Sequence, residues 1–270
     1  MTGLFPLLLE PETLYPLLHE ASLLVVDLSG PQGQRIGHIP GATHLEYGAL
    51  LATQWPIGGL LPNEQHLGRV LSATGLTPES HVVAYDDEGG GKAGRLLWTL
   101  DVLGHRRFSL LNGGLYAWAN EGYPLERGAN RRSPSRYQAA VTEHAHADKD
   151  YILGKLGNPD VTLLDVRTPE EFHGLVRYAA RAGHIPGAVN MDWTLTIDTS
   201  RNLRLKPENK LRELLERRGV TPDREVIVYC QTHHRSSHTY AVLKVLGYPR
   251  IRGYPGSWSE WGNLATTPVE

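Results

Sequence analysis

The residue of this chain best suited to covalent chemistry is Cys230, the single cysteine among 270 residues. Polar residues follow it directly: Gln231, Thr232, His233, His234, Arg235 and Ser236. A thiol acts as a nucleophile in its thiolate form, and cysteines of low pKa are typically found at helix N-termini beside cations. The sequence therefore indicates nucleophilic catalysis by a sulfur anion, with Arg235 as the neighbouring cation.

The segments on either side of Cys230 predict a strand before it and a helix after it. Residues Val226 to Tyr229 are apolar and mostly β-branched, and the apolar residues between Thr239 and Leu246 follow the helical repeat. Ligands bind at the carboxyl ends of strands in an open α/β sheet, and a loop that opens a helix directs free N–H groups into its own hollow. We therefore expect a Cys230 thiolate in a hollow that also holds an anion.

Two other interpretations of Cys230 are open from the residues alone. The first is an inert, buried thiol, which is what most free cysteines are, but the polar residues after it argue against this. The second is a metal site, because Cys230, His234 and His238 follow one another at intervals of four, as ligands on a helix do. The chain has no second cysteine, and a loop lined by its own N–H groups suits an anion better than a cation. We expect no metal and no cofactor.

The same order of motifs occurs twice in the sequence, which predicts two duplicated domains. The segment GHIPGA at residues 37–42 returns at 183–188, and GLTP at 75–78 is matched by GVTP at 219–222. Predicted strands alternate with predicted helices in each copy, so the fold class is α/β, each domain being a mostly parallel sheet with helices on both faces. The predicted boundaries are 1–126 for domain 1, 127–150 for a polar linker and 151–270 for domain 2.

The first copy lacks the nucleophile of the second. When Tyr85 is aligned with Tyr229, Asp86 stands where Cys230 stands, and two further carboxylic acids follow it. Carboxylates at this place would repel an anionic substrate. We therefore predict that domain 1 is catalytically inactive and that domain 2 carries the reaction.

Several other conspicuous residues are predicted to have structural roles. Thr168 to Glu171 fits a helix start, with Thr168 as N-cap, proline in the first helical position and Glu171 closing a capping box. Asp165 and Arg167 are expected to form an ion pair or to anchor a turn. His38 and His184 are expected to be turn or interface residues, and Trp118 and Trp258 to be core aromatics.

The composition predicts a soluble globular protein. Hydrophobic residues make up 40% of the chain and charged residues 21%, and the formal net charge of -2 argues against nucleic acid or an anionic membrane as a partner. One cysteine allows no intramolecular disulfide, as in a reducing compartment. The first positive side chain is Arg35, so the basic start of a signal peptide is missing, and no run approaches the roughly 20 apolar residues of a membrane span. We expect a cytoplasmic protein.

Over nearly its whole length the chain resembles the tandem-domain rhodaneses, the thiosulfate sulfurtransferase family. The motifs that carry the resemblance are the duplicated domains, both GHIPGA loops, the strand end at Asp165 and Arg167, NGGL at 112–115 before Trp118, and GSW at 256–258. The loop CQTHHR at 230–235 resembles the active-site loop of a bacterial branch of this family. In the family only the C-terminal domain is catalytic, which agrees with Asp86 in domain 1.

Two features differ from other branches of the family. Vertebrate thiosulfate enzymes have a loop of the CRKGVT type and mercaptopyruvate enzymes one of the CGSG or CGTG type, and this chain has neither. Those enzymes also place a substrate-binding arginine where this chain has Glu171. The assignment of thiosulfate rather than mercaptopyruvate therefore rests on the bacterial loop.

The resemblance implies a double displacement through a persulfide on Cys230. The thiolate attacks the outer sulfur of thiosulfate, sulfite leaves, and an acceptor then removes the sulfur. The expected acceptors are cyanide, a thiol or a protein.

The predicted substrate- and oxyanion-binding residues are Gln231, Thr232, His233, His234, Arg235 and Ser236. The backbone N–H groups of residues 231–235 would hold the persulfide and the departing oxyanion. We expect His233 and His234 to make the rim of the site electropositive. Arg235 should brace the loop, and Thr232 should donate a hydroxyl hydrogen bond.

Two other functions stay open. A phosphatase or arsenate reductase on the same scaffold uses Cys-x5-Arg, which would require arginine at the position of Ser236, and the shorter loop of this chain leaves room for a sulfur rather than a phosphate. A sulfur carrier, or binding module, would hold the persulfide for a partner protein. It needs the same thiolate, so the sequence does not separate it from an enzyme.

Overall fold

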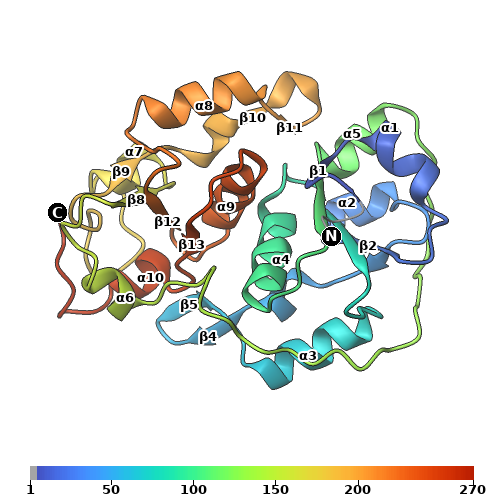
Figure 1. Cartoon of the computed structure of the whole chain (residues 1–270), viewed down its shortest axis with the longest axis horizontal. Helices are drawn as coiled ribbons and strands as arrows, with labels where there is room; N and C mark the ends of the chain where they lie inside the picture. The colour runs from blue at the N-terminus through green and yellow to red at the C-terminus, as the bar shows by residue number, and fades with distance from the viewer. Residues whose placement is uncertain (1–4) are drawn as a thin grey trace. The chain divides into compact units, whose positions relative to one another are not determined.

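The computed structural model describes residues 5–270, which form two compact units (Figure 1). Unit 1 consists of residues 5–50, Pro62–Thr142 and Ile197–Leu205, and unit 2 of Leu51–Leu61, Glu143–Thr196 and Lys206–Glu270. The first four residues of the predicted domain 1 lie outside the described residues. Short 3₁₀ helices occur at Tyr15–Leu17, Tyr47–Leu50, Trp193–Thr196 and Thr199–Arg201.

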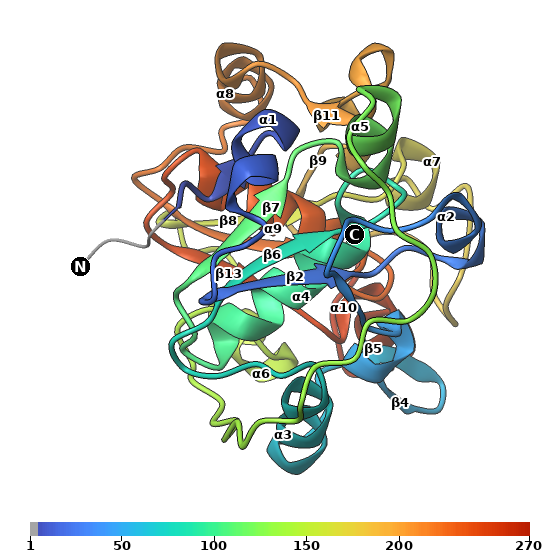
Figure 2. The ribbon, with the colours of Figure 1, turned by 90° about the vertical axis from the view of Figure 1, so that its right-hand side faces the viewer.

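Unit 1 is built on a five-stranded sheet in which all neighbouring strands are parallel, with β2, β6 and β7 side by side in Figure 2. The strand order is β1 (Leu8–Leu9), β7 (Phe108–Leu111), β6 (His81–Tyr85), β2 (Leu23–Asp27) and β3 (Thr43–His44). The helices are α1 (Pro11–Leu14), α2 (Pro31–Ile36), α3 (Glu64–Ala73), α4 (Gly91–Val102) and α5 (Gly114–Asn120). Every residue of β2, β6 and β7 is buried, so both faces of the sheet are covered.

Unit 2 is built on a four-stranded parallel sheet. The strand order is β13 (Ile251–Gly253), β12 (Glu225–Tyr229), β8 (Val161–Asp165) and β9 (Val189–Asn190). The helices are α6 (Lys149–Leu153), α7 (Pro169–Phe172), α8 (Glu208–Glu216), α9 (Arg235–Val245) and α10 (Ser257–Trp261). The parallel α/β fold predicted from the sequence is confirmed in both units.

The helix after Cys230 has Arg235 at its start, as the sequence predicts. The apolar repeat marks only the part after Thr239, whereas α9 begins at Arg235. Its first turn carries Ser236, Ser237 and His238, which are fully buried although they are polar. A hydrophobic pattern cannot detect a first turn whose buried side chains are hydroxyls and an imidazole.

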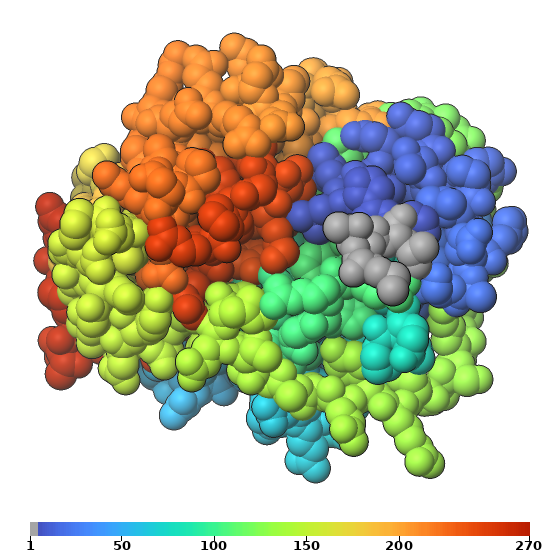
Figure 3. Space-filling model, viewed as in Figure 1, coloured from blue at the N-terminus to red at the C-terminus, as the bar shows by residue number. Residues whose placement is uncertain are grey.

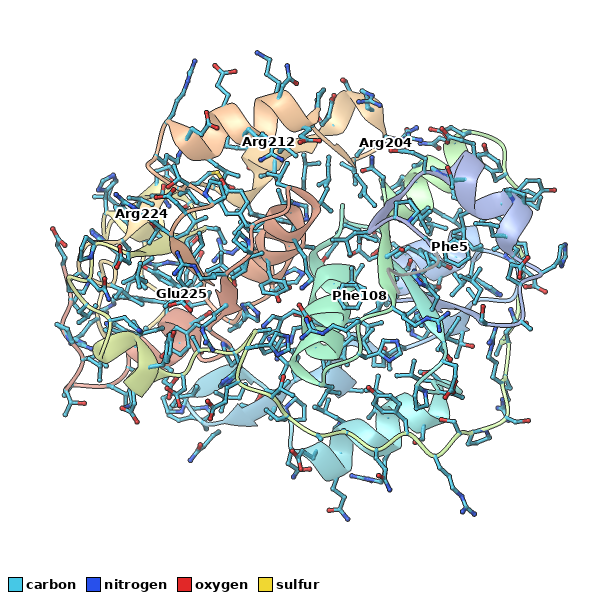
Figure 4. All side chains as sticks on the ribbon, in the orientation of Figure 1. Phe5, Phe108, Arg204, Arg212, Arg224 and Glu225 are labelled. Atoms are coloured by element: carbon cyan, nitrogen blue, oxygen red, sulfur yellow. The ribbon has the colours of Figure 1, made fainter. Side chains whose placement is uncertain are left out.

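Two antiparallel hairpins are exchanged between the two sequence repeats. The pair β4 (Ala52–Gln54) and β5 (Ile57–Leu60) comes from the first repeat but belongs to unit 2, and the pair β10 (Ile197–Asp198) and β11 (Arg204–Leu205) comes from the second repeat but belongs to unit 1. Arg204, labelled in Figure 4, forms ion pairs with Glu10 and Glu121 of unit 1. The repeat predicts two domains but carries no signal for this exchange.

The helices are short, and those at the surface bury one face. Even α4, buried along nearly its whole length, has only 12 residues. At the surface of unit 2 (Figure 3), α8 buries only Leu211 and Leu215, which lie one turn apart on one face. Arg212 on the same helix, labelled in Figure 4, donates to the carbonyl oxygen of Leu246 at 2.8 Å. None of the helices within residues 5–270 has the length and apolar character of a bilayer span.

The side chains predicted to be structural are so in the structure. Trp118 and Trp258 are fully buried in the cores of unit 1 and unit 2. Arg167 and Asp165 form a buried ion pair with 2.6 Å between Nη2 and Oδ2, and the same Nη2 donates to the carbonyl oxygen of Gly183 at 2.7 Å. The pair therefore ties the end of β8 to the second GHIPGA loop.

The two histidines of the repeated loops also contact backbone carbonyl oxygens. The His184 ring stacks on Phe172 with 3.6 Å between ring centroids, and its Nδ1 lies 2.9 Å from the carbonyl oxygen of Phe172. In unit 1 the N–H of His38 donates to the carbonyl oxygen of Glu126 at 2.9 Å. Both contacts support the prediction that these histidines serve turns.

Candidate active site

Cys230 lies directly after β12, at the carboxyl edge of the sheet of unit 2. Its carbonyl oxygen accepts the N–H of Trp258 at 2.9 Å, and its own N–H donates to Ser257 Oγ at 3.3 Å. These two bonds attach the cysteine backbone to the first turn of α10. The side chain is therefore fixed between the end of β12 and the start of α9, as the sequence predicts.

The Cys230 sulfur is buried, but its neighbours are polar. The residue is 1% exposed, and the Ser236 hydroxyl donates to Sγ at 3.4 Å. The backbone N–H groups of Thr232 and Ser236 also bond the sulfur. Burial alone would raise the pKa of the Cys230 thiol, but the Arg235 charge and these hydrogen bonds outweigh burial and lower the pKa. These surroundings favour a thiolate over an inert thiol.

Arg235, the first residue of α9, is held in place by Glu171 from α7. Nη1 lies 2.5 Å from Oε2, and Nη2 lies 2.8 Å from Oε1, which makes the pair bidentate. The Glu171 carboxylate also accepts the N–H of Thr168 at 3.2 Å, closing the predicted capping box. Burial acts to raise the pKa of Glu171, but the bonds and charge of Arg235 outweigh it and lower the pKa. Glu171 is thus the partner through which Arg235 can brace the loop, as the sequence predicts.

The structure corrects the prediction for His233. Its side chain is 0% exposed and does not line the rim of the site. The backbone of His233 has φ +55, in the left-handed region that few residues other than glycine adopt. This conformation turns the imidazole inward, where Nδ1 lies 2.7 Å from Ser236 Oγ. A periodicity argument has no means of predicting a positive φ at a histidine.

Two other loop side chains lie nearer the surface. His234 is half-buried, and its ring lies 6.1 Å from that of Trp193 between centroids. Gln231 is also half-buried, and its Nε2 donates to the carbonyl oxygen of Tyr178 at 3.2 Å. His234 thus keeps its predicted position at the rim of the loop, and the predicted role of Gln231 in binding the substrate stays a prediction.

The hairpin β4–β5 packs against the loop within unit 2. Gly59 has φ +76, and a Cβ added there would lie 2.1 Å from the carbonyl oxygen of Thr232. The Gly58 N–H donates to Ser259 Oγ at 3.2 Å, and the Ser259 N–H donates to the carbonyl oxygen of Gln231 at 2.9 Å. The loop is thus held between β5 and α10. Sequence reasoning missed the glycines because about 170 positions separate them from Cys230.

The corresponding loop of unit 1 shows what such a loop binds. The carboxylate of Asp86, at the place of Cys230, accepts the N–H groups of Glu88 at 3.0 Å, Gly90 at 2.9 Å and Ala93 at 2.9 Å. Burial and the Glu88 charge raise the pKa of Asp86 against these bonds. The loop between a strand and its helix therefore directs its N–H groups at an acceptor in unit 1 also, a carboxyl group supplied by the protein itself.

The histidines that suggested a metal site are engaged elsewhere. His238 is buried, its Nε2 lies 2.7 Å from Thr196 Oγ1, and its ring meets that of Trp193 edge-on at 5.2 Å. Within residues 5–270 no group of three or more His, Cys, Asp or Glu side chains is placed to hold a metal ion. The donors around Cys230 are hydroxyl and N–H groups, which suit an anion.

Known proteins share both halves of this chain. The Rhodanese-like domain family matches residues 10–121 and 148–264. A thiosulfate sulfurtransferase of Azotobacter vinelandii is 45% identical over 265 residues, covering 98% of this chain and 97% of the relative. The sulfur carrier protein TtuD of Thermus thermophilus is 34% identical over 247 residues, covering 86% and 85%.

Among solved structures, SseA from Escherichia coli, described as having the rhodanese fold of the 3-mercaptopyruvate sulfotransferases, superposes with a TM-score of 0.83. The sequences are 26% identical, and the match covers 94% of this chain and 99% of that one. The likeness therefore extends over both units and over nearly all of that structure.

Proposed function

Because the chain belongs to the rhodanese family and is a thiosulfate sulfurtransferase, we propose that Cys230 carries the transferred sulfur as a persulfide. The observation that supports this most directly is the setting of its sulfur, which is buried yet bonded by a hydroxyl and two backbone N–H groups. A thiolate there is a nucleophile in a site that largely excludes water.

The reaction proceeds in two halves. In the first, the Cys230 thiolate attacks the outer sulfur of thiosulfate, a new S–S bond forms, the S–S bond of thiosulfate breaks, and sulfite leaves with the electron pair. In the second, cyanide or a thiol attacks the outer sulfur of the persulfide and releases the thiolate. Electrons balance without a cofactor, and sulfite leaves without needing a proton.

The loop N–H groups stabilise the negative charge that develops in both halves. Residues 231–236 contribute backbone donors, and the Thr232 hydroxyl and the His234 ring meet the oxyanion at the mouth of the loop. Asp86 supports this assignment, because its carboxylate is bound by the same kind of loop in unit 1. Arg235 contributes its charge and is positioned by Glu171.

Domain 1, assigned to residues 1–126, serves as an inactive scaffold, domain 2, assigned to 151–270, performs the reaction, and residues 127–150 link them. The inactivity of domain 1 is supported by Asp86, which occupies the place of Cys230 and leaves this domain without a nucleophile there. We place the protein in the cytoplasm, where a reducing environment keeps the single cysteine free.

Steady-state kinetics test the persulfide directly. Initial rates measured over a grid of thiosulfate and cyanide concentrations should give parallel double-reciprocal lines, the signature of a ping-pong mechanism. Cys230→Ser, which keeps a hydroxyl in place of the thiol, should lower kcat by more than about 1000-fold. Intersecting lines, or a Cys230→Ser variant that keeps its activity, would rule out a Cys230 intermediate.

A sulfur carrier is the second candidate function, and the similarity to TtuD is the observation that favours it. A carrier would discharge its persulfide onto a protein thiol faster than onto cyanide or glutathione at equal concentration. Transfer from persulfide-loaded protein to a panel of thiol-containing proteins and to glutathione measures that ratio. Equal or faster discharge to small acceptors would exclude the carrier role.

Phosphate ester hydrolysis has less support. Both terminal nitrogens of Arg235 are bonded to Glu171, so this arginine already has an anion and is not open to a phosphate. The loop is also one residue shorter than the Cys-x5-Arg pattern. A chromogenic aryl phosphate should therefore not be hydrolysed above the rate of the Cys230→Ser variant.

A further inference from the structure

Three fully buried residues form a hydrogen-bonded chain that ends on the reactive sulfur. Ser236 Oγ lies 3.4 Å from Cys230 Sγ, and His233 Nδ1 lies 2.7 Å from the same Oγ. The three residues are 1%, 0% and 0% exposed, in the order Cys230, Ser236 and His233. The hydroxyl of Ser236 is therefore shared between the sulfur and the imidazole.

The direction of these two hydrogen bonds depends on whether Nδ1 of His233 carries a proton. A serine hydroxyl donates once, and its oxygen can accept from a second group. If the Ser236 proton points to the Cys230 thiolate, the contact of 2.7 Å requires that His233 Nδ1 carries a proton and donates it to Oγ. If Nδ1 is bare instead, it takes the hydroxyl proton, and a lone pair of Oγ then faces the thiolate.

The backbone supports a dedicated role for His233. Its φ of +55 is uncommon outside glycine, although histidine, asparagine and aspartate adopt it more often than other residues. Residues held in such conformations cluster at functional sites. Here the conformation places the imidazole against the hydroxyl that contacts the sulfur.

We propose that His233 is a positioning residue whose Nδ1 proton fixes the Ser236 hydroxyl as a donor to the Cys230 sulfur. This role rests on the proposed function of Cys230. The hydrogen bond stabilises the thiolate as nucleophile in the first half-reaction and as leaving group in the second. Arg235 also acts on the sulfur and is itself bound to Glu171. Neither of these residues contacts His233 through the Ser236 hydroxyl, so changes at Ser236 or His233 should leave the charge of Arg235 in the site.

The single cysteine makes the test clean, because alkylation of the native protein reports on Cys230 alone. The rate of modification by iodoacetamide, followed by intact mass between pH 5 and 10, gives the pKa of the thiol. Ser236→Ala and His233→Ala should each raise this pKa by about one unit, because each removes or misdirects a hydrogen bond to a charged group.

Two variants serve as controls. His233→Asn keeps an N–H donor near the position of Nδ1 and tolerates a positive φ, so it should restore the parent pKa to within about 0.3 units. Ser237→Ala removes a buried hydroxyl that donates to the carbonyl oxygen of His234 at 2.7 Å, so it should leave the pKa of Cys230 unchanged.

A merely structural role of His233 predicts a different result. His233→Ala would then lower the melting temperature but leave the alkylation pKa at the parent value, and His233→Asn would show no rescue. Either result would overturn the proposal, and Ser236→Ala tests the chain separately should His233→Ala fold poorly. Persulfide formation on Cys230 is measured on the same parent sample. A parent that forms no persulfide contradicts the proposed function, whereas unchanged pKa values in the variants contradict only the role of His233 and Ser236.

Discussion

The Arg235 charge acts against burial to lower the pKa of the Cys230 thiol, and the position of Arg235 itself depends on Glu171. Glu171 is nearly fully buried and makes bonds to both terminal nitrogens of Arg235. The carboxylate that closes the capping box of α7 is therefore also the one that fixes the first residue of α9. One side chain joins the scaffold of unit 2 to the geometry of its loop.

Glu171→Gln tests this pairing at neutral pH. Glutamine preserves the capping box but removes the charge that pairs with Arg235, so we expect a loss of about 2–3 kcal/mol in the free energy of unfolding. Urea titration followed by circular dichroism measures it. Glu170→Gln, an exposed neighbour on the same helix, should change stability by less than about 0.5 kcal/mol. Equal effects of the two variants would contradict the role of Glu171.

The pH dependence of the same difference has a defined sign. The pKa of Glu171 is lower in the folded protein than in the unfolded chain, so its contribution is fully present above the unfolded value of about 4.3. The contribution disappears as the pH falls through the lowered folded-state pKa. The parent and Glu171→Gln should therefore differ most near pH 7 and converge once the pH has fallen below the lowered pKa of Glu171.

At the scale of elements, the loop after β12 is positioned by the hairpin β4–β5 as well as by α10. Gly59→Ala should be strongly destabilising, because a Cβ would overlap the carbonyl oxygen of Thr232 and would also sit at a positive φ. We expect a loss of about 3 kcal/mol in the free energy of unfolding and at least a tenfold loss of sulfur transfer.

Gly58→Ala is the matched control. A Cβ at Gly58 would lie 3.7 Å from Thr232 Cγ2, an ordinary van der Waals contact. Thermal unfolding and turnover should both stay near the parent values. A Gly59→Ala variant as stable and active as Gly58→Ala would show that the hairpin does not constrain the loop.

A change in the loop of unit 1, unlike Gly59→Ala, should lower stability without lowering activity. Asp86→Ala removes the acceptor of three backbone N–H groups and should lower stability by about 1–3 kcal/mol. Turnover per folded molecule should remain at the parent value, because the nucleophile lies in unit 2. Loss of turnover in correctly folded Asp86→Ala would show that unit 1 contributes more than a scaffold.

For the molecule as a whole, the sequence predicts much of the fold because the evidence for it is local. The strand before Cys230, the duplicated motifs and the capping box at Thr168 are set by neighbouring residues, and the structure contains all three. The loop residues are likewise contiguous, so their proximity to the sulfur is predictable from their order. The conformation of each loop residue is not predictable from the order of the residues.

What the sequence does not predict depends on contacts between distant segments or on unusual backbone angles. The packing of Gly59 on Thr232 joins segments more than 170 positions apart, and the bond of Arg235 to Glu171 spans 64 positions. The inward turn of His233 follows from a positive φ. The exchange of hairpins between the repeats is a property of the tertiary fold that neither repeat encodes by itself.

Intact mass spectrometry of the protein treated with thiosulfate and then freed of small molecules tests the role of Cys230 most directly. The parent should gain the mass of one sulfur atom and lose it again on addition of cyanide. Cys230→Ala should gain nothing. A parent that gains no sulfur, or a Cys230→Ala variant that gains as much as the parent, would contradict a persulfide on this residue.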